Sequence, residues 1–294
     1  MERSVFPVDE DYLSILDGIM ESGTVQPDRT NIGESKQVFA ETLWFDTCGE
    51  AVPFIQCRTF APRIAFHEWK WMIGGSTDST YLEDRGIHIW SAHTSREFLD
   101  SRGLHDLPVG SVGKSYGHQF RNFGGVDQVQ GVYDSLKNDP MSRRHIVSIW
   151  NPAELDAAPL APCAFLYEFM VEGDELHLHQ HMRSADVPFG VPYNMAFSAF
   201  WLFSFAQALG YKPGKYWLTM TNAHVYKNQY EIVDTMLETW AGTFATTGTQ
   251  RPVPKLSFTK PLNSLEDILA LEWEDVVVTD WVRGPKIGDA EIAL

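Results

Sequence analysis

Residues 160–210, LAPCAFLYEFMVEGDELHLHQHMRSADVPFGVPYNMAFSAFWLFSFAQALG, are the stretch that decides the fold. Ala164–Val171 and Leu176–Met182 are predicted strands, and the turn sequence EGDE at 172–175 joins them. Met195–Leu209 is a long apolar segment closed by Gly210, which predicts a buried helix. A buried helix that follows a strand pair indicates an α+β fold, and we expect a single catalytic domain over residues 1–294.

The remaining periodicities extend this pattern along the chain. A long polar, glycine-containing stretch at 91–115 suggests an excursion near a site, and Thr243–Arg251 is predicted to be a surface loop. No internal repeat, low-complexity tract or linker is found. Helices are predicted at Asp9–Ser22, Ala65–Ile73, Gln128–Asn138 and Tyr226–Thr239, and strands at Val38–Phe45, His145–Trp150 and Tyr216–Met220.

The composition excludes several functional classes. The chain has 294 residues, and its 23 Lys+Arg against 39 Asp+Glu give a formal net charge of −16. Nucleic-acid polymers and anionic membranes are therefore not expected as partners, because both are bound through basic side chains. No apolar run is long enough for a membrane span or a signal peptide. Three scattered cysteines suit a reducing compartment, so we expect a cytoplasmic protein, in the host cytoplasm if it is viral.

Cys163 lies at a loop-to-strand junction after Pro162, where it is either a small buried side chain or a nucleophile. A reactive thiol needs nearby positive charge, which lowers its pKa. Arginine and serine together also make a phosphate pocket, because guanidinium groups bind phosphate oxygens bidentately. The alternative for each arginine is an ordinary surface position. The candidates are Arg29, Arg143, Arg144, Arg183 and Ser184.

Two further polar residues lie in unusual local sequences, one after a segment whose backbone is restricted by prolines and one inside an apolar run. Asn194 ends the segment DVPFGVPYN, and its amide can either recognise a pyrimidine edge or cap a helix that begins near Met195. Glu68 lies inside the apolar run AFHEWKWM at 65–72, where burial would raise its pKa toward values suited to proton transfer.

His177, His179 and His181 alternate along one predicted strand, which raises the possibility of a zinc site. A strand separates alternate residues widely, and no fourth ligand follows nearby. We therefore expect no metal.

Four ordered blocks carry a resemblance to a known family. The chain resembles thymidylate synthases and the related pyrimidine-nucleotide (dUMP and dCMP) hydroxymethylases from Asp28 to its C-terminus. The resemblance implies an α+β fold whose large twisted mixed β-sheet packs back to back in an obligate homodimer, with flanking helices. The blocks are KNDPMSRRHIVSIWNP at 137–152, LAPC at 160–163, RSADVPFGVPYN at 183–194 and NAHVYKNQYE at 222–231.

The resemblance also implies roles for individual residues. Cys163 would attack C6 of the pyrimidine, Glu68 would organise proton transfers around O4, and Tyr116 would help to remove the C5 proton. Asn194 and Asp186 complete the implied catalytic set. The nucleotide would be held by Arg29, Arg183 and Ser184 at the phosphate, by Arg143 and Arg144 from the other subunit, and by His224 and Tyr226 at the sugar. Methylenetetrahydrofolate, the implied co-substrate, would be bound by Arg58, Ile89, Trp90, Asp186, Gly190, Tyr193 and Ala293, with the tail at 292–294 closing over the site.

The product depends on what attacks the intermediate: a folate hydride gives thymidylate, and water gives a hydroxymethyl nucleotide. Asn194 accompanies uracil in the family, whereas dCMP hydroxymethylase has Asp, so we expect dUMP as substrate. Several departures from the synthase pattern suggest a smaller and more polar wall beside the folate, which would admit water. These departures are Ser91, Ala92 and His93 in IWSAH (89–93), and Ala164, Glu168, Met182 and Asn222.

We therefore expect a phage-type dUMP hydroxymethylase. Thymidylate synthase is the alternative, favoured by the retained Trp90 and C-terminal tail, and a dCMP or CMP hydroxymethylase is a lesser one. A silent member that binds nucleotide or mRNA is opposed by the intact Cys163, Glu68 and Asn194 and by the acidic charge. A histidine-based metal hydrolase is weaker still.

Overall fold

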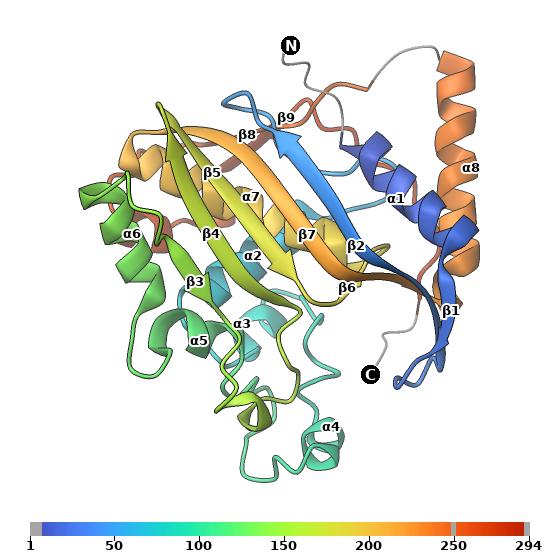
Figure 1. Ribbon diagram of the computed structural model, residues 1–294, viewed down its shortest axis with the longest axis horizontal. Helices are drawn as coiled ribbons and strands as arrows, with labels where there is room; N and C mark the ends of the chain where they lie inside the picture. Colours follow the sequence, from blue (N-terminus) through green and yellow to red (C-terminus); the bar gives the residue numbers. More distant parts are fainter. Residues whose placement is uncertain (1–7, 248–250, 291–294) are drawn as a thin grey trace.

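A large mixed β-sheet forms the centre of the molecule in a computed structural model that describes residues 8–247 and 251–290 (Figure 1). The strand order in the described residues is β1-β2-β7-β5-β4-β3, with β6 beside β7. β5 and β6 run parallel to β7, and the other neighbours are antiparallel, so the predicted mixed sheet is confirmed. The strands are β1 (Thr24–Pro27), β2 (Glu34–Asp46), β3 (Ile146–Ser148), β4 (Ala164–Glu172), β5 (Glu175–Met182), β6 (Ala185–Asp186) and β7 (Lys212–Tyr226), and β8 (Lys255–Phe258) pairs separately with β9 (Val276–Thr279).

Helices cover one face of this sheet and one of its sides. In Figure 1, α2 and α7 lie behind the strands, and α1 and α8 stand beside β2. Short helices follow α2 and build the region below the sheet. The helices are α1 (Asp9–Ser22), α2 (Pro62–Ile73), α3 (Thr80–Glu83), α4 (Arg96–Ser101), α5 (Tyr116–Asn122), α6 (Gln128–Asn138), α7 (Gly190–Leu209), α8 (Tyr230–Thr247) and α9 (Leu265–Leu269), with 3₁₀ turns at Leu155–Ala157, Lys227–Gln229 and Trp273–Asp275.

The core is built on aromatic contacts between α2 and α7. Phe200 of α7 packs against Phe66 of α2 with ring centroids 5.4 Å apart and against Trp69 at 6.0 Å. Phe54, in the segment before α2, completes the cluster at 5.7 Å from Phe200. Fully buried aromatic rings contribute a large share of the hydrophobic free energy of a domain. These contacts fix α2, which carries Glu68, against the helix that carries Asn194.

The other face of the sheet is not covered by any element of the described chain (Figure 1). Four large apolar side chains on it remain 39% to 52% exposed: Trp44, Ile146, Met170 and Trp217. Trp44 and Trp217 are register partners on β2 and β7, and their rings stack with centroids 5.8 Å apart. Exposed apolar patches of this kind mark surfaces that bind another molecule.

The structure confirms most predicted elements and corrects several boundaries, including those of α7, β7 and α8. α7 begins at Gly190 rather than Met195, because Pro192 lies in the first turn, where no backbone N–H needs an intrahelical acceptor. β7 runs from Lys212 to Tyr226 and is therefore longer than the predicted Tyr216–Met220. A 3₁₀ turn follows it, so α8 begins at Tyr230 and not at Tyr226. The predicted loop at Thr243–Arg251 is wrong over its first part, because α8 continues to Thr247.

Candidate active site

Cys163 stands immediately before β4, and its backbone is held from two directions. Its N–H donates to Tyr116 Oη at 2.7 Å, and its carbonyl oxygen accepts from the N–H of Arg183 at 2.9 Å. Burial raises the pKa of the Cys163 thiol, while the positive charges of Arg183 and Arg29 oppose that rise. The structure therefore brings Arg183 into contact with the predicted nucleophile, and Arg29 acts on the thiol through its charge.

Arg183 holds the segment that leads to the nucleophile. Its Nε donates to the carbonyl oxygen of Pro162 at 2.8 Å, and Nη2 donates to that of Ala161 at 2.9 Å. The guanidinium also lies over the ring of Trp150, 5.4 Å from its centroid. Ser184 follows in the turn between β5 and β6 and is partly buried. Arg183 thus positions Cys163 as well as placing positive charge beside it.

A carboxyl group, an indole and a phenol lie in contact next to this thiol. Glu68 of α2 accepts a hydrogen bond from Trp90 Nε1 at 2.8 Å, and burial raises the pKa of Glu68 to about 7. Trp90 packs edge-on against Tyr116, with ring centroids 5.8 Å apart. The carboxyl thus has the raised pKa that its apolar surroundings predict. Such a group can donate and accept protons near neutral pH.

Asn194 lies in the first turns of α7, and a buried network fixes the orientation of its amide. Its Oδ1 accepts from Gln180 Nε2 at 3.1 Å, and its Nδ2 donates to the carbonyl oxygen of Gly190 at 3.0 Å. Gln180 Oε1 in turn accepts from Ser198 at 2.9 Å and from Tyr216 at 2.6 Å. The Gly190 carbonyl oxygen can only accept, so Asn194 Nδ2 must face it and Oδ1 must face Gln180, whose Nε2 then points at Asn194. Neither amide can flip without losing hydrogen bonds.

The sequence analysis did not identify this network. Gln180 alternates with the histidines along β5, so it lies on the opposite face of the strand, where it is fully buried. A polar residue at a core-facing strand position was the signal that could have revealed it.

His224 and Tyr226 occupy the end of β7 and contact each other. Their ring centroids are 4.8 Å apart, and His224 Nδ1 lies 2.8 Å from Asn222 Oδ1. Burial lowers the pKa of His224, which keeps the ring neutral around pH 7. Arg29 is exposed in the turn between β1 and β2.

The predicted folate residues fall into two groups. Arg58 is buried, and its Nε and Nη2 donate to the carbonyl oxygen of Pro188 at 3.1 and 2.6 Å. Its guanidinium also lies over the Phe189 ring, so it fixes the segment after Asp186. Asp186 accepts from the N–H of Phe189 at 3.3 Å and from Gln229 Nε2 at 3.3 Å, and burial raises its pKa.

The remaining folate candidates offer apolar surface. Ile89 precedes Trp90 and packs on the core, as does Tyr193, whose ring lies 5.1 Å from that of Phe60. Gly190 is the first residue of α7. Ala293 lies outside the described residues.

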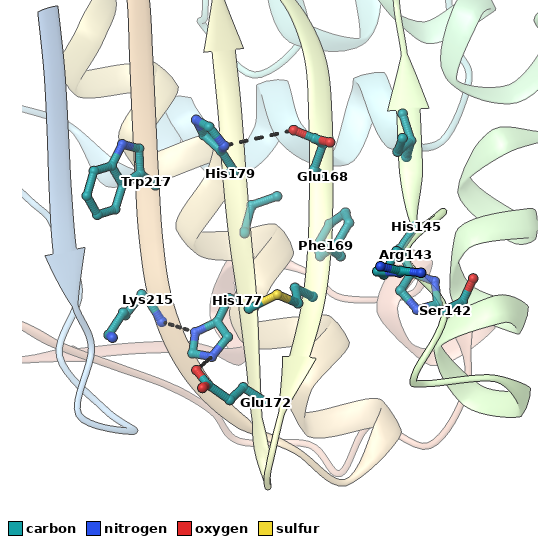
Figure 2. A pocket seen from close by; sticks show the side chains of 13 residues that line it. Ser142, Arg143, His145, Glu168, Phe169, Glu172, His177, His179, Lys215 and Trp217 are labelled. Carbon is teal, nitrogen blue, oxygen red and sulfur yellow. Dashed lines mark hydrogen bonds and ion pairs between the residues drawn. The ribbon is translucent and has the colours of Figure 1, made fainter.

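Two of the predicted phosphate-binding arginines lie away from the other candidate site residues. Arg143 and Arg144 precede β3 and are exposed. Arg143 lines a cavity of about 560 Å³ on the uncovered sheet face, together with His177 and Lys215 (Figure 2). Within one chain, the structure therefore does not bring these arginines to Cys163.

The polar replacements near Trp90 have partners within the protein. His93 is 9% exposed and packs edge-on against Trp90 and Phe98, with ring centroids 6.2 and 5.2 Å away. Ser91 donates to Glu83 Oε1 at 2.7 Å. The smaller and more polar wall inferred from these residues stays a prediction, and both side chains have partners within the protein. Glu168 does not line this site, because it lies on the uncovered sheet face.

A thiol, a carboxyl that titrates near pH 7 and a fixed amide are suited to nucleophilic addition followed by proton transfer. The chain belongs to the thymidylate synthase family, whose model matches residues 10–293. The chain is 34% identical over 291 residues to a bifunctional dihydrofolate reductase-thymidylate synthase of Leishmania major, covering 94% of this chain and 54% of that protein. It therefore spans about half the length of that relative.

Two shorter relatives match over nearly their whole length. A thymidylate synthase of Saccharomyces cerevisiae is 31% identical over 301 residues, covering 95% of each chain. A thymidylate synthase of Equine herpesvirus 2 is 34% identical over 272 residues, covering 88% of this chain and 90% of the relative. Among the described residues, no helix is both long enough and apolar enough to cross a bilayer.

Proposed function

We propose that this protein is a one-carbon transferase that acts at C5 of dUMP, with thymidylate as its product. The observation that carries the proposal is the juxtaposition of Cys163, Tyr116 and the Glu68–Trp90 pair in a chain of the thymidylate synthase family. The hydroxymethylase expected from the sequence receives no support from the relatives, which carry the name thymidylate synthase. Thymidylate synthase, the alternative reading, is better supported.

The mechanism follows from the chemistry of these groups. The Cys163 thiolate adds to C6, which makes C5 nucleophilic, and Glu68 shuttles protons at O4 because its pKa lies near 7. Tyr116, in contact with the nucleophile's backbone, is placed to assist removal of the C5 proton. Methylenetetrahydrofolate would supply the methylene and then a hydride, held against the apolar surfaces of Ile89, Trp90 and Tyr193.

The packing of His93 and Ser91 supports the methyl product. A hydroxymethyl product requires water at the methylene intermediate, and excluding water favours hydride transfer. His93 fills space between Trp90 and Phe98 instead of opening it, and Ser91 is satisfied by Glu83.

The orientation of Asn194 supports uracil over cytosine. After its bonds to Gln180 and Gly190, the amide retains one N–H donor and one oxygen lone pair. These match O4 and N3–H of uracil. Cytosine offers the reversed pattern and would need the amide to flip, which the Gln180 network opposes.

We further propose a homodimer formed by the uncovered sheet face, with Arg143 and Arg144 reaching the phosphate in the partner's site. The exposed Trp44, Ile146, Met170 and Trp217 support such an interface, as does the position of Arg143 on that face. A cytoplasmic location stays a prediction.

The product assay tests the proposal directly. The protein is incubated with dUMP and methylenetetrahydrofolate, the nucleotide is weighed by mass spectrometry, and dihydrofolate is followed by its absorbance. We expect a methylated nucleotide and dihydrofolate in equal amounts. A hydroxymethyl nucleotide without dihydrofolate would overturn the proposed product, and no turnover by the wild type beside a Cys163→Ser control would overturn the activity.

A further inference from the structure

Three potential metal ligands converge on the uncovered sheet face, away from the candidate active site. They are Glu168 on β4 and His179 and His181 on β5, and their ligand atoms all lie within 4.8 Å of one another. We propose that these three side chains form a binding site for a divalent transition-metal ion, with Zn²⁺ as its natural occupant. The proposal does not depend on the proposed reaction, which needs no metal.

Strand pairing explains how the cluster forms. Glu168 and His179 are register partners on the antiparallel pair β4–β5, and His181 follows two residues later on the same face. Glu168 Oε2 lies 2.9 Å from His181 Nε2 and 3.9 Å from His179 Nδ1. Figure 2 shows the His179 and Glu168 side chains turned toward each other across the two strands.

The histidines are closer than the strand spacing predicts. The rings of His179 and His181 lie with centroids only 3.8 Å apart, so the expectation of widely separated ligands is wrong for this pair. His177 is not a member of the cluster, because its Nδ1 accepts from the N–H of Lys215 at 2.8 Å and its Nε2 faces Glu172 at 3.6 Å. The missing ligand comes from the neighbouring strand rather than from nearby sequence.

The surroundings of the cluster suit a metal. His179 Nε2 lies 2.8 Å from Thr219 Oγ1, and an outer-shell partner of this kind orients a ligating imidazole. When Nε2–H donates to Thr219, Nδ1 presents its lone pair toward Glu168 and His181.

Ligand type and access point to the same class of ion. Two imidazoles and one carboxylate are the ligands that Zn²⁺ and its neighbours prefer, and three protein ligands leave a position for water. In the single chain the three side chains are 23% to 41% exposed. The face that carries them is the one proposed above as the homodimer interface, so a bound ion would be enclosed between the subunits. The net charge of −16 raises the local concentration of cations.

Metal binding to the full-length, tag-free protein tests the site. After dialysis against a chelator, the protein is titrated with ZnCl₂ by calorimetry, and bound zinc per chain is counted by elemental analysis. Cobalt(II) is titrated in parallel, because its visible spectrum reports nitrogen and oxygen ligation. We expect one ion per chain, and a rise in melting temperature that follows occupancy.

Matched variants locate the ion. Glu168→Gln and His181→Gln should each weaken binding by at least about 10-fold, and Thr219→Val should weaken it about 10- to 100-fold through the orientation of His179. His177→Gln, on the same strand but outside the cluster, should bind like the wild type. The proposal would be overturned if the wild type bound no metal. It would also be overturned if binding persisted in the triple variant in which Glu168, His179 and His181 are each replaced by Gln.

Discussion

At the scale of single residues, the candidate site depends on two groups whose ionisation is set by burial. Burial raises the pKa of Cys163 and of Glu68, and only Cys163 has arginine charges beside it that oppose the effect. The thiol therefore needs the site's positive charge to become a thiolate, whereas the carboxyl is held close to the pH at which it can exchange protons.

The raised pKa of Glu68 predicts a pH-dependent stability. Its folded-state pKa of about 7 lies above the ordinary 4.5, so its ionisation costs folding free energy as the pH rises from 4.5 to 7. By linkage the full cost is about 3 kcal/mol above pH 7. Glu68→Gln should therefore be more stable than the wild type by up to that amount at pH 8, and equally stable at pH 4. Urea unfolding at several pH values measures the difference.

Glu97→Gln is a suitable control for this experiment, because Glu97 is exposed on α4. It should shift stability little at any pH. A Glu68→Gln variant whose stability relative to the wild type does not change between pH 4 and pH 8 would contradict the prediction.

At the scale of secondary-structure elements, regular apolar spacing in the sequence predicted the helices well, but the sequence did not show which distant strands would pair. The structure matches the predicted α6 at Gln128–Asn138 because its apolar residues repeat at helical spacing. β7 was underpredicted because Pro213 and Gly214 interrupt its pattern, while pairing with β2 extends it to Tyr226. Strand propensity depends only on residues close in the sequence, whereas β7 is extended by pairing with β2, about 180 residues away in the chain.

The same limit applies to the site. Cys163, Glu68 and Asn194 became candidates because each is chemically unusual in its local sequence, and the family resemblance then joined them in one predicted site. The Tyr116 contact to Cys163 and the Gln180 contact to Asn194 could not, because sheet register and helix packing create them.

The Gln180 network predicts an effect on base selection. Gln180→Met keeps the side-chain length but removes the donor to Asn194 Oδ1, so only the bond to the Gly190 carbonyl oxygen still holds the amide orientation. We expect the preference for dUMP over dCMP in kcat/KM to fall at least about 10-fold, which corresponds to loss of one hydrogen bond of about 1.4 kcal/mol. Competition between the two nucleotides measures it directly.

Gln130→Met, at a half-buried position of α6 whose amide bonds to Asp134, provides the comparison and should leave the preference intact. If Gln180→Met lowered turnover of dUMP without changing the ratio, the network would serve folding alone.

At the scale of the whole molecule, the net charge has the same sign as the charges of the proposed substrates. The net charge of −16 should repel a nucleotide phosphate and a folate, so binding must depend on a local reversal of sign. Arg29 and Arg183 supply part of that reversal beside Cys163. The exposed Arg143 and Arg144 can add to it only if a second chain presents them.

Mixing subunits tests this sharing of residues. Cys163→Ser and the Arg143→Ala, Arg144→Ala double variant should each be nearly inactive with dUMP. When they are unfolded and refolded together, half of the dimers should be mixed, and each should contain one complete site. Roughly a quarter of the wild-type activity should return. Activity that does not rise above the sum of the two variants would show that the arginines act within their own chain.

The stacked pair Trp44–Trp217 gives the uncovered face its own optical reporter. Both indoles are partly exposed, and Trp217 is the register partner of His179 in the proposed metal cluster. Covering the face should move their fluorescence emission to shorter wavelength, and a paramagnetic ion such as Cu²⁺ beside His179 should quench it. Replacing both Trp44 and Trp217 by Phe should remove both signals, so association and ion occupancy can be followed in solution without a label.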